Sequence, residues 1–182
     1  FFLCLGVTLL TRPNVCGSKI EGAGPKGEEN MNVAVVTLVT TSSYVPGAEV
    51  LAESLQRVNA IGDRVLLYVP PEEDDRSDIT VQHLRDLELA GWNKLQPLTT
   101  ENGKFSKCKG AELVANVEEL STMARYWGTC SKLALWSLVE YDKVIYIDAD
   151  SIVLNNFDHL YDIIQQSKGI NFAAQQSPNC PA

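Results

Sequence analysis

The chain has 182 residues, 45% of them hydrophobic and 21% charged, which is typical of a globular domain with a full core. Its 15 Lys+Arg and 23 Asp+Glu give a net charge of −8, which argues against nucleic acid or an anionic membrane as the main partner. The five cysteines include no C-x-x-C pair, so neither a zinc site nor a disulfide framework is indicated.

Residues 1–30 are expected to form a signal-like or unstructured segment and a linker. Residues 1–10 are apolar but too short to span a bilayer. They fit the end of a secretory signal, which would place the protein in the secretory pathway or the Golgi. A true start at Met31 fits equally well and would place it in the cytoplasm. Residues 18–30 are rich in Gly, Glu and Lys, as linkers are.

From residue 31 onward, apolar strand patterns alternate with helical ones, while residues 99–123 carry no clear pattern. Such alternation indicates a parallel sheet with right-handed crossovers. The predicted elements are strand 33–39, helix 47–58, strand 65–69, helix 79–90, strand 92–98, helix 130–141 and strand 143–147.

The most informative feature is the pair of carboxylates, Asp148 and Asp150, that follows the apolar run 144–147. In open α/β sheets, ligands bind outside the carboxyl ends of the strands. Two carboxylates there can share one divalent cation, and that cation can hold a diphosphate. The alternative interpretation is a loop whose Asp side chains simply close the strand in Asx turns.

A loop of small hydroxyl residues follows the first predicted strand. It contains Thr40 and Thr41 and ends in Tyr44, which could stack on a base. Such a loop often contacts the base and ribose of a nucleotide, although no G-x-G-x-x-G is present. The same residues could instead cap the next helix.

Lys132 is predicted to lie in the first turn of a helix, with Thr129 or Ser131 as the cap. A cation there opposes the helix dipole, whereas free amides at a helix N-terminus attract anions. Lys132 therefore suits a diphosphate, and Arg125 could reach the same charge. The alternative is a solvated lysine on a surface turn.

Taken together, three blocks of residues resemble glycosyltransferase family 8, the family of glycogenin. The resemblance implies an α/β, Rossmann-like domain of the GT-A type with a mostly parallel sheet, of which residues 31–182 would be the donor-binding part, truncated at the C-terminus. It also implies a UDP-sugar donor, Mn²⁺ or another divalent cation, and hexosyl transfer with retention of configuration. The matching blocks are residues 36–55, 131–138 and 144–160.

The resemblance also implies roles for single residues. Asp148 and Asp150 match the metal ligands, and the Ala149 backbone would approach the ribose. Thr41 stands where glycogenin has Asn. The residues implied to bind the nucleotide-sugar are Leu38, Thr40, Thr41, Tyr44, Arg125, Lys132, Asp148, Ala149 and Asp150.

The family's third metal ligand, a His in a His-x-x-Gly-x-x-Lys segment, has no match before Ala182. We therefore expect residues 31–182 alone to bind donor weakly and to transfer nothing. The catalytic residue and the acceptor, whether carbohydrate, protein or lipid, cannot be named, and a homodimer is left open.

Two alternatives stand beside a glycosyltransferase. One is a phosphohydrolase of the haloacid dehalogenase type, which also has a strand ending in Asp-x-Asp with the first Asp as nucleophile. In that family the pair ends the first strand, whereas here about two β–α units precede it. The other is a truncated domain that binds nucleotide-sugar without transferring it.

Overall fold

The computed structural model describes residues 7–11, 31–73, 77–98, 129–162 and 172–174, and all structural statements concern these residues. Six strands form one sheet in the order β4-β3-β2-β5-β1-β6. The elements in chain order are β1 (Val7–Thr11), β2 (Val33–Val39), the 3₁₀ turn η1 (Ser42–Tyr44), α1 (Val45–Arg57), β3 (Asp63–Tyr68), α2 (Val81–Ala90), β4 (Lys94–Pro97), the 3₁₀ segment η4 (Thr129–Ser137), β5 (Lys143–Ile147) and β6 (Phe172–Ala174).

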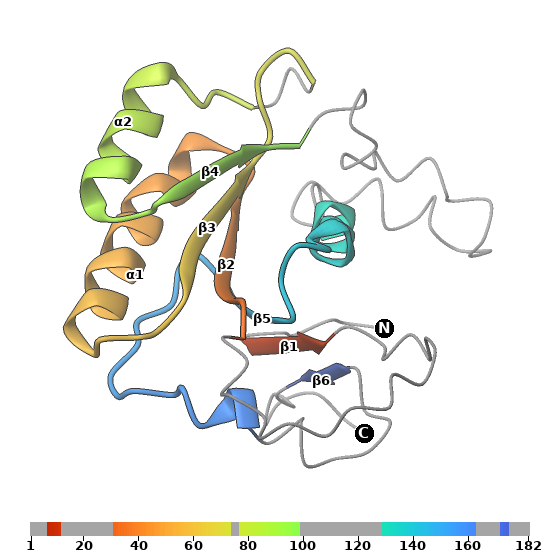
Figure 1. Ribbon diagram of the computed structural model, residues 1–182. Coiled ribbons are helices and arrows are strands. Elements are labelled where there is room, and N and C mark those ends of the chain that lie inside the picture. The colour runs from red at the N-terminus through yellow and green to blue at the C-terminus, as the bar shows by residue number, and fades with distance from the viewer. Residues whose placement is uncertain (1–6, 12–30, 74–76, 99–128, 163–171, 175–182) are drawn as a thin grey trace, which may run out of the picture.

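The four strands β4, β3, β2 and β5 run parallel. Both α1 and α2 lie on one side of this sheet, and η4 lies on the other (Figure 1). This arrangement confirms the predicted α/β architecture with a mostly parallel sheet. It also brings the carboxyl ends of β2 and β5, two neighbouring strands, to the same edge.

The central strand β2 is buried over its whole length, as its apolar run, interrupted only by Thr37, predicts. Successive side chains of β2 lie alternately in two hydrophobic cores, one on each side of the sheet. Val33, Val35 and Val39 pack toward α1, whereas Ala34, Val36 and Leu38 pack with residues of η4. The same alternation in β5 puts Ile145 and Ile147 in the first core and Val144 and Tyr146 in the second. Tyr146 therefore lies on the η4 side of the sheet.

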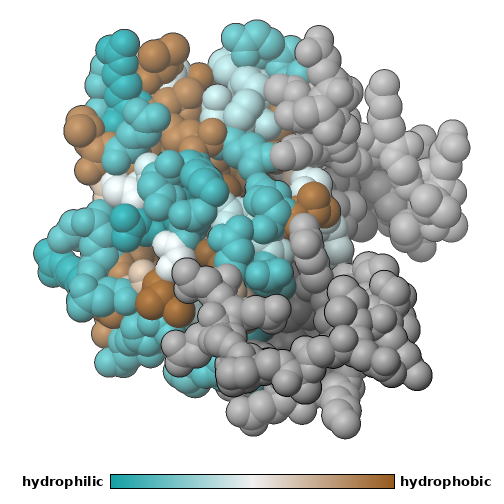
Figure 2. All heavy atoms as spheres, viewed as in Figure 1, coloured by the Kyte–Doolittle hydropathy of each residue, from teal (hydrophilic) through white to brown (hydrophobic). Residues whose placement is uncertain are grey.

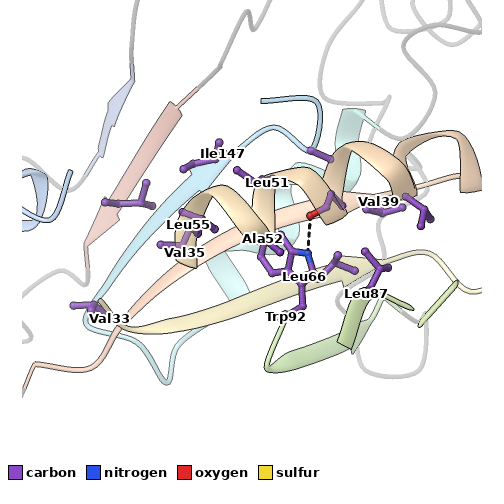
Figure 3. Packing of buried hydrophobic residues seen from close by; sticks show 14 of the residues in the cluster. Val33, Val35, Val39, Leu51, Ala52, Leu55, Leu66, Leu87, Trp92 and Ile147 are labelled. Atoms are coloured by element: carbon purple, nitrogen blue, oxygen red, sulfur yellow. Dashed lines mark hydrogen bonds between the residues drawn. The ribbon is translucent and has the colours of Figure 1, made fainter. Parts of the chain in front are cut away.

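Helix α1 packs its apolar stripe on the sheet (Figure 3). Leu51 and Leu55 are fully buried against Val35 and Leu66 in that core. The helix begins two residues before the predicted start, because proline is well tolerated in a first helical turn.

Trp92 belongs to this core. The strand predicted over 92–98 is shorter in the structure, where it is β4 and begins at Lys94, so Trp92 lies outside it. Its indole Nε1 donates a hydrogen bond of 3.0 Å to the carbonyl of Ala48 in α1, drawn in Figure 3. The tryptophan thus ties the first helix to the segment before β4.

Helix α2 has recognisable signals at both ends. The hydroxyl of Thr80 accepts from the backbone amide of His83, and the ring Nδ1 of His83 accepts from the amide of Thr80, which makes a capping box. Gly91 ends the helix in a left-handed conformation with φ 116°, directly after the predicted last residue of the helix.

One prediction about secondary structure is wrong. Residues 130–141 do not form an α-helix, because the structure has the 3₁₀ segment η4, which ends at Ser137. The threefold spacing that suggested an α-helix is the period of a 3₁₀ helix. Trp136 and Val139 are exposed, and the buried apolar residues of this stretch are Ala134, Leu135, Leu138 and Tyr141.

A second difference concerns the N-terminal segment. Residues Val7–Thr11, for which the sequence analysis predicts no strand, form β1, which pairs antiparallel with β5 and with β6. Their alternation of Val, Leu and Thr suits a strand that covers an otherwise open sheet edge. The boundary at Met31 and the compartment stay predictions. Four of the cysteines, Arg125 and residues 99–123 lie outside the described residues.

Exposed apolar side chains are dispersed over several elements. Leu89 and Val81 of α2 are examples, and on the face seen in Figure 2 hydrophobic patches are interrupted by hydrophilic ones. Within the described ranges, no helix is both long enough and apolar enough to cross a bilayer.

Candidate nucleotide-sugar site

The two carboxylates lie in a tight turn directly after β5. The backbone amide of Ser151 donates to the carbonyl of Asp148 at 3.1 Å and closes the turn. Ala149 is buried, and Asp150 is exposed. The turn thus anchors its middle residue while leaving a carboxylate open to solvent.

The start of α1 packs directly on this turn. A Cβ added to Gly47 would meet the carbonyl oxygen of Ala149 at 2.7 Å, too close for any other residue without movement. Further along α1, the hydroxyl of Ser54 accepts from the amide of Val153 at 3.1 Å. The helix therefore contacts the middle of the carboxylate turn at Ala149 and the segment that follows the turn at Val153.

Asp148 is held by two donors from the η4 side of the sheet. The Nζ of Lys132 lies 2.7 Å from Oδ1 of Asp148, and the hydroxyl of Tyr146 donates to the same oxygen at 2.8 Å. Lys132 also lies over the Tyr146 ring, with Nζ 5.1 Å from the centroid. The side chains of Lys132 and Asp148 are 26% and 28% exposed, so the pair is shielded yet reachable.

The phenol of Tyr146 is a donor here for electrostatic reasons. Burial raises its pKa well above the usual value, and Asp148, Asp150 and Tyr44 raise it further. The phenol is therefore protonated at neutral pH and donates to the carboxylate.

The loop after β2 lies at the same edge of the sheet. Leu38 and Thr40 are largely buried, whereas Thr41 is partly exposed and Tyr44 exposed. The Thr41 and Ser43 hydroxyls are hydrogen-bonded at 2.7 Å. Among the predicted uridine-binding residues, Thr41 and Tyr44 thus offer side chains to a ligand, and Leu38 and Thr40 shape the loop from within.

Asp78 fixes this loop from a distant segment. One carboxylate oxygen accepts from the Ser42 amide at 2.6 Å, and the other accepts from the Ser42 hydroxyl at 2.5 Å. The Ser42 hydrogen bonds hold the pKa of Asp78 below its usual value. No local pattern could have found this residue, because the contact joins positions 36 apart.

The structure therefore brings together the predicted residues Tyr44, Lys132, Asp148 and Asp150, with the Ala149 backbone between the carboxylates. Tyr146 and Gly47 are additional residues of the site that the sequence analysis did not identify. Tyr146 could have been found, because a residue two positions before Asp148 projects from the same face of an extended chain. Gly47 could not, since nothing local indicates a close approach to residue 149.

Oxygen donors of this kind suit a hard divalent cation. Within the described ranges, however, no group of three or more His, Cys, Asp or Glu side chains could hold one. Asp148 and Asp150 could therefore supply only part of a coordination shell, and its other positions would have to come from water, a ligand or other residues. His83 caps α2 and is not part of such a group.

Comparison with known proteins agrees with this geometry. The family described as "Glycosyl transferase family 8" matches residues 35–179, which include most of β2, the loop after it, Lys132 and the carboxylate turn. The chain belongs to glycosyltransferase family 8. Its fold and the position of its carboxylates favour this family over the phosphohydrolase alternative.

Three relatives from Arabidopsis thaliana illustrate the similarity. UDP-glucuronate:xylan alpha-glucuronosyltransferase 2 is 35% identical over 82% of this chain and 21% of its own length. Inositol phosphorylceramide glucuronosyltransferase 1 is 30% identical over 76% of this chain and 22% of its own length. Galactinol synthase 3 is 29% identical over 74% of this chain and 35% of its own length. The chain thus spans a fifth to about a third of these relatives.

Proposed function

We propose that this chain is the donor-binding part of a metal-dependent, retaining glycosyltransferase that takes a hexose or hexuronic acid from a UDP-sugar. The proposal rests on the position of Lys132, Asp148 and Asp150, which lie close together at the carboxyl edge of a parallel sheet. It also rests on the membership of the chain in family 8. Glucuronosyl groups are included because two of the relatives are named for them.

Different residues would bind different parts of such a donor. Tyr44 and Thr41 are available to the uridine, and Lys132 carries positive charge beside the carboxylates. A divalent cation, for which we propose Mn²⁺, would supply the charge that stabilises the departing diphosphate. Asp148 and Asp150 would hold that cation, and the Ala149 backbone between them would border the ribose.

Nucleotide selectivity tests this proposal. In calorimetric titrations with Mn²⁺ present, we expect the 182-residue chain to bind UDP, UDP-glucuronate, UDP-glucose and UDP-galactose, and to bind ADP and ADP-glucose far more weakly. The difference is expected because the loop after β2 would contact the base. Equal binding of adenine and uracil nucleotides would contradict the proposal, and the ranking of the three UDP-sugars would identify the sugar.

A further inference from the structure

We propose that Tyr146 is the positioning residue that orients the Asp148 carboxylate for cation binding, an inference that rests on the proposed function. Its hydroxyl donates to Oδ1 of Asp148 at 2.8 Å, and Lys132 donates to the same oxygen at 2.7 Å. Two donors on one oxygen fix the rotation of the carboxylate group.

The other oxygen of Asp148 is the one left for a metal. Among the described residues, no hydrogen-bond donor contacts Oδ2 of Asp148, although Asp148 is only 28% exposed. When Oδ1 of a carboxylate is held by two donors, Oδ2 points in one fixed direction. Because the Asp148 side chain is already ordered before a cation binds, cation binding costs less side-chain conformational entropy.

The position of Tyr146 suits this task better than a role in packing alone. Its side chain is 2% exposed, so the hydroxyl cannot turn away to solvent and has Asp148 as its partner. Its ring also lies beneath the Nζ of Lys132, 5.1 Å from the centroid. One tyrosine thus places both the carboxylate and the ammonium that neutralises it.

The chain contains a matched control for this hydroxyl. Tyr161 is also a buried tyrosine, 1% exposed, and within the described part of the chain its hydroxyl has no hydrogen-bond partner. Tyr146→Phe and Tyr161→Phe each remove one buried oxygen and keep the ring. Only the first change removes a donor to Asp148.

The experiment measures free Mn²⁺ by electron paramagnetic resonance as the chain is titrated at saturating UDP. Tyr146→Phe is expected to weaken Mn²⁺ binding about tenfold, the lower range for loss of a hydrogen bond to a metal ligand. Tyr161→Phe is expected to bind as the wild type does. Unchanged Mn²⁺ affinity in Tyr146→Phe, even with a lower melting temperature, would show a purely structural tyrosine and overturn the inference.

A second variant keeps the test decisive if Tyr146→Phe does not fold. Asp148→Glu retains the charge at a partly exposed position but moves the carboxylate away from both donors. The positioning account expects Mn²⁺ affinity to fall about as much as in Tyr146→Phe, whereas wild-type affinity would contradict it. If the wild type itself binds no Mn²⁺ with UDP, the proposed function fails, which differs from a failure confined to Tyr146.

Discussion

At the scale of single residues, Lys132 shows how the structure changes an expectation. A lysine in the first turn of a helix is expected to oppose folding slightly, because its charge opposes the helix dipole. Replacing Lys132 was therefore predicted to leave the stability of the chain unchanged or to raise it. In the structure it is half-buried in an ion pair with Asp148 and lies over an aromatic ring. Both contacts favour the folded state, so Lys132 is expected to contribute to stability as well as to ligand binding.

Lys132→Ala should therefore lower the free energy of unfolding by about 1 kcal/mol and weaken UDP binding in the presence of Mn²⁺. The loss of binding follows from removing the positive charge beside the diphosphate. Urea denaturation and calorimetry measure the two effects separately.

Lys94→Ala is the matched control, because Lys94 makes an ion pair of 2.6 Å with Asp63 at the opposite end of the sheet. It should destabilise the chain to a similar extent and leave UDP affinity unchanged. Equal loss of UDP affinity in both variants would contradict a specific role for Lys132.

At the scale of secondary-structure elements, Asp63 connects three segments at the amino end of the strands. Its carboxylate accepts from Lys94 of β4 and from the Tyr141 hydroxyl at 2.9 Å, just before β5. The hydrogen bond from Lys94 is the main reason why the pKa of Asp63 lies below its usual value. A carboxyl whose pKa is lowered on folding stabilises the protein above its unfolded pKa and loses that effect as the pH falls.

Asp63→Asn should accordingly lower the melting temperature at pH 7, by the equivalent of about 1 kcal/mol or less for this partly exposed pair. The difference from wild type should shrink as the pH falls below about 4, the unperturbed pKa of an aspartate. Calorimetric melting curves from pH 2 to pH 7 measure the effect. A difference that stays constant over this range would show that the charge of Asp63 is not what matters.

The packing of α1 on the carboxylate turn gives a second prediction at this scale. Gly→Ala inside a helix normally stabilises by up to about 1 kcal/mol. Gly47→Ala should instead destabilise and weaken UDP binding, because the new Cβ would lie 2.7 Å from the Ala149 carbonyl and push the turn away.

Val50→Ala, at an exposed position of the same helix, is the control and should leave UDP affinity unchanged. Chemical denaturation and calorimetry of both variants make the comparison. If Gly47→Ala is more stable than wild type and binds UDP equally well, the turn does not depend on this contact.

Secondary-structure elements could be predicted from the sequence where residues close to one another in the chain determine them. The apolar run of β2 and the helical pattern of α2 lie within a few residues of sequence, and they predicted the elements closely. The 3₁₀ character of η4 and the pairing of β1 were not predictable, because the first depends on packing against the sheet and the second on a partner strand more than a hundred residues away. The same reason explains the contact of Asp78 with Ser42.

At the scale of the whole molecule, the sheet places two loops from distant parts of the sequence at one edge. The loop after β2 and the turn after β5 are about a hundred residues apart in sequence, yet their strands are neighbours and parallel. Asp148 and Asp150 could be predicted as the centre of the site because apolar runs mark strand ends. The partners of Asp148 could be identified only in part, since Lys132 was predicted to serve a diphosphate and not an ion pair.

The central claim is that this edge binds the diphosphate of a UDP-sugar through a cation on Asp148 and Asp150. Calorimetric titration of UDP into the chain, with Mn²⁺ and with a chelator, tests it most directly. Diphosphate and carboxylates repel each other without a cation, so UDP should bind about tenfold or more tightly with Mn²⁺. Asp150→Asn should abolish this difference, while Glu88→Gln, the same change of charge at an exposed position of α2, should preserve it. UDP affinity that is equal with Mn²⁺ and with chelator, or equal in Asp150→Asn and wild type, would contradict the claim.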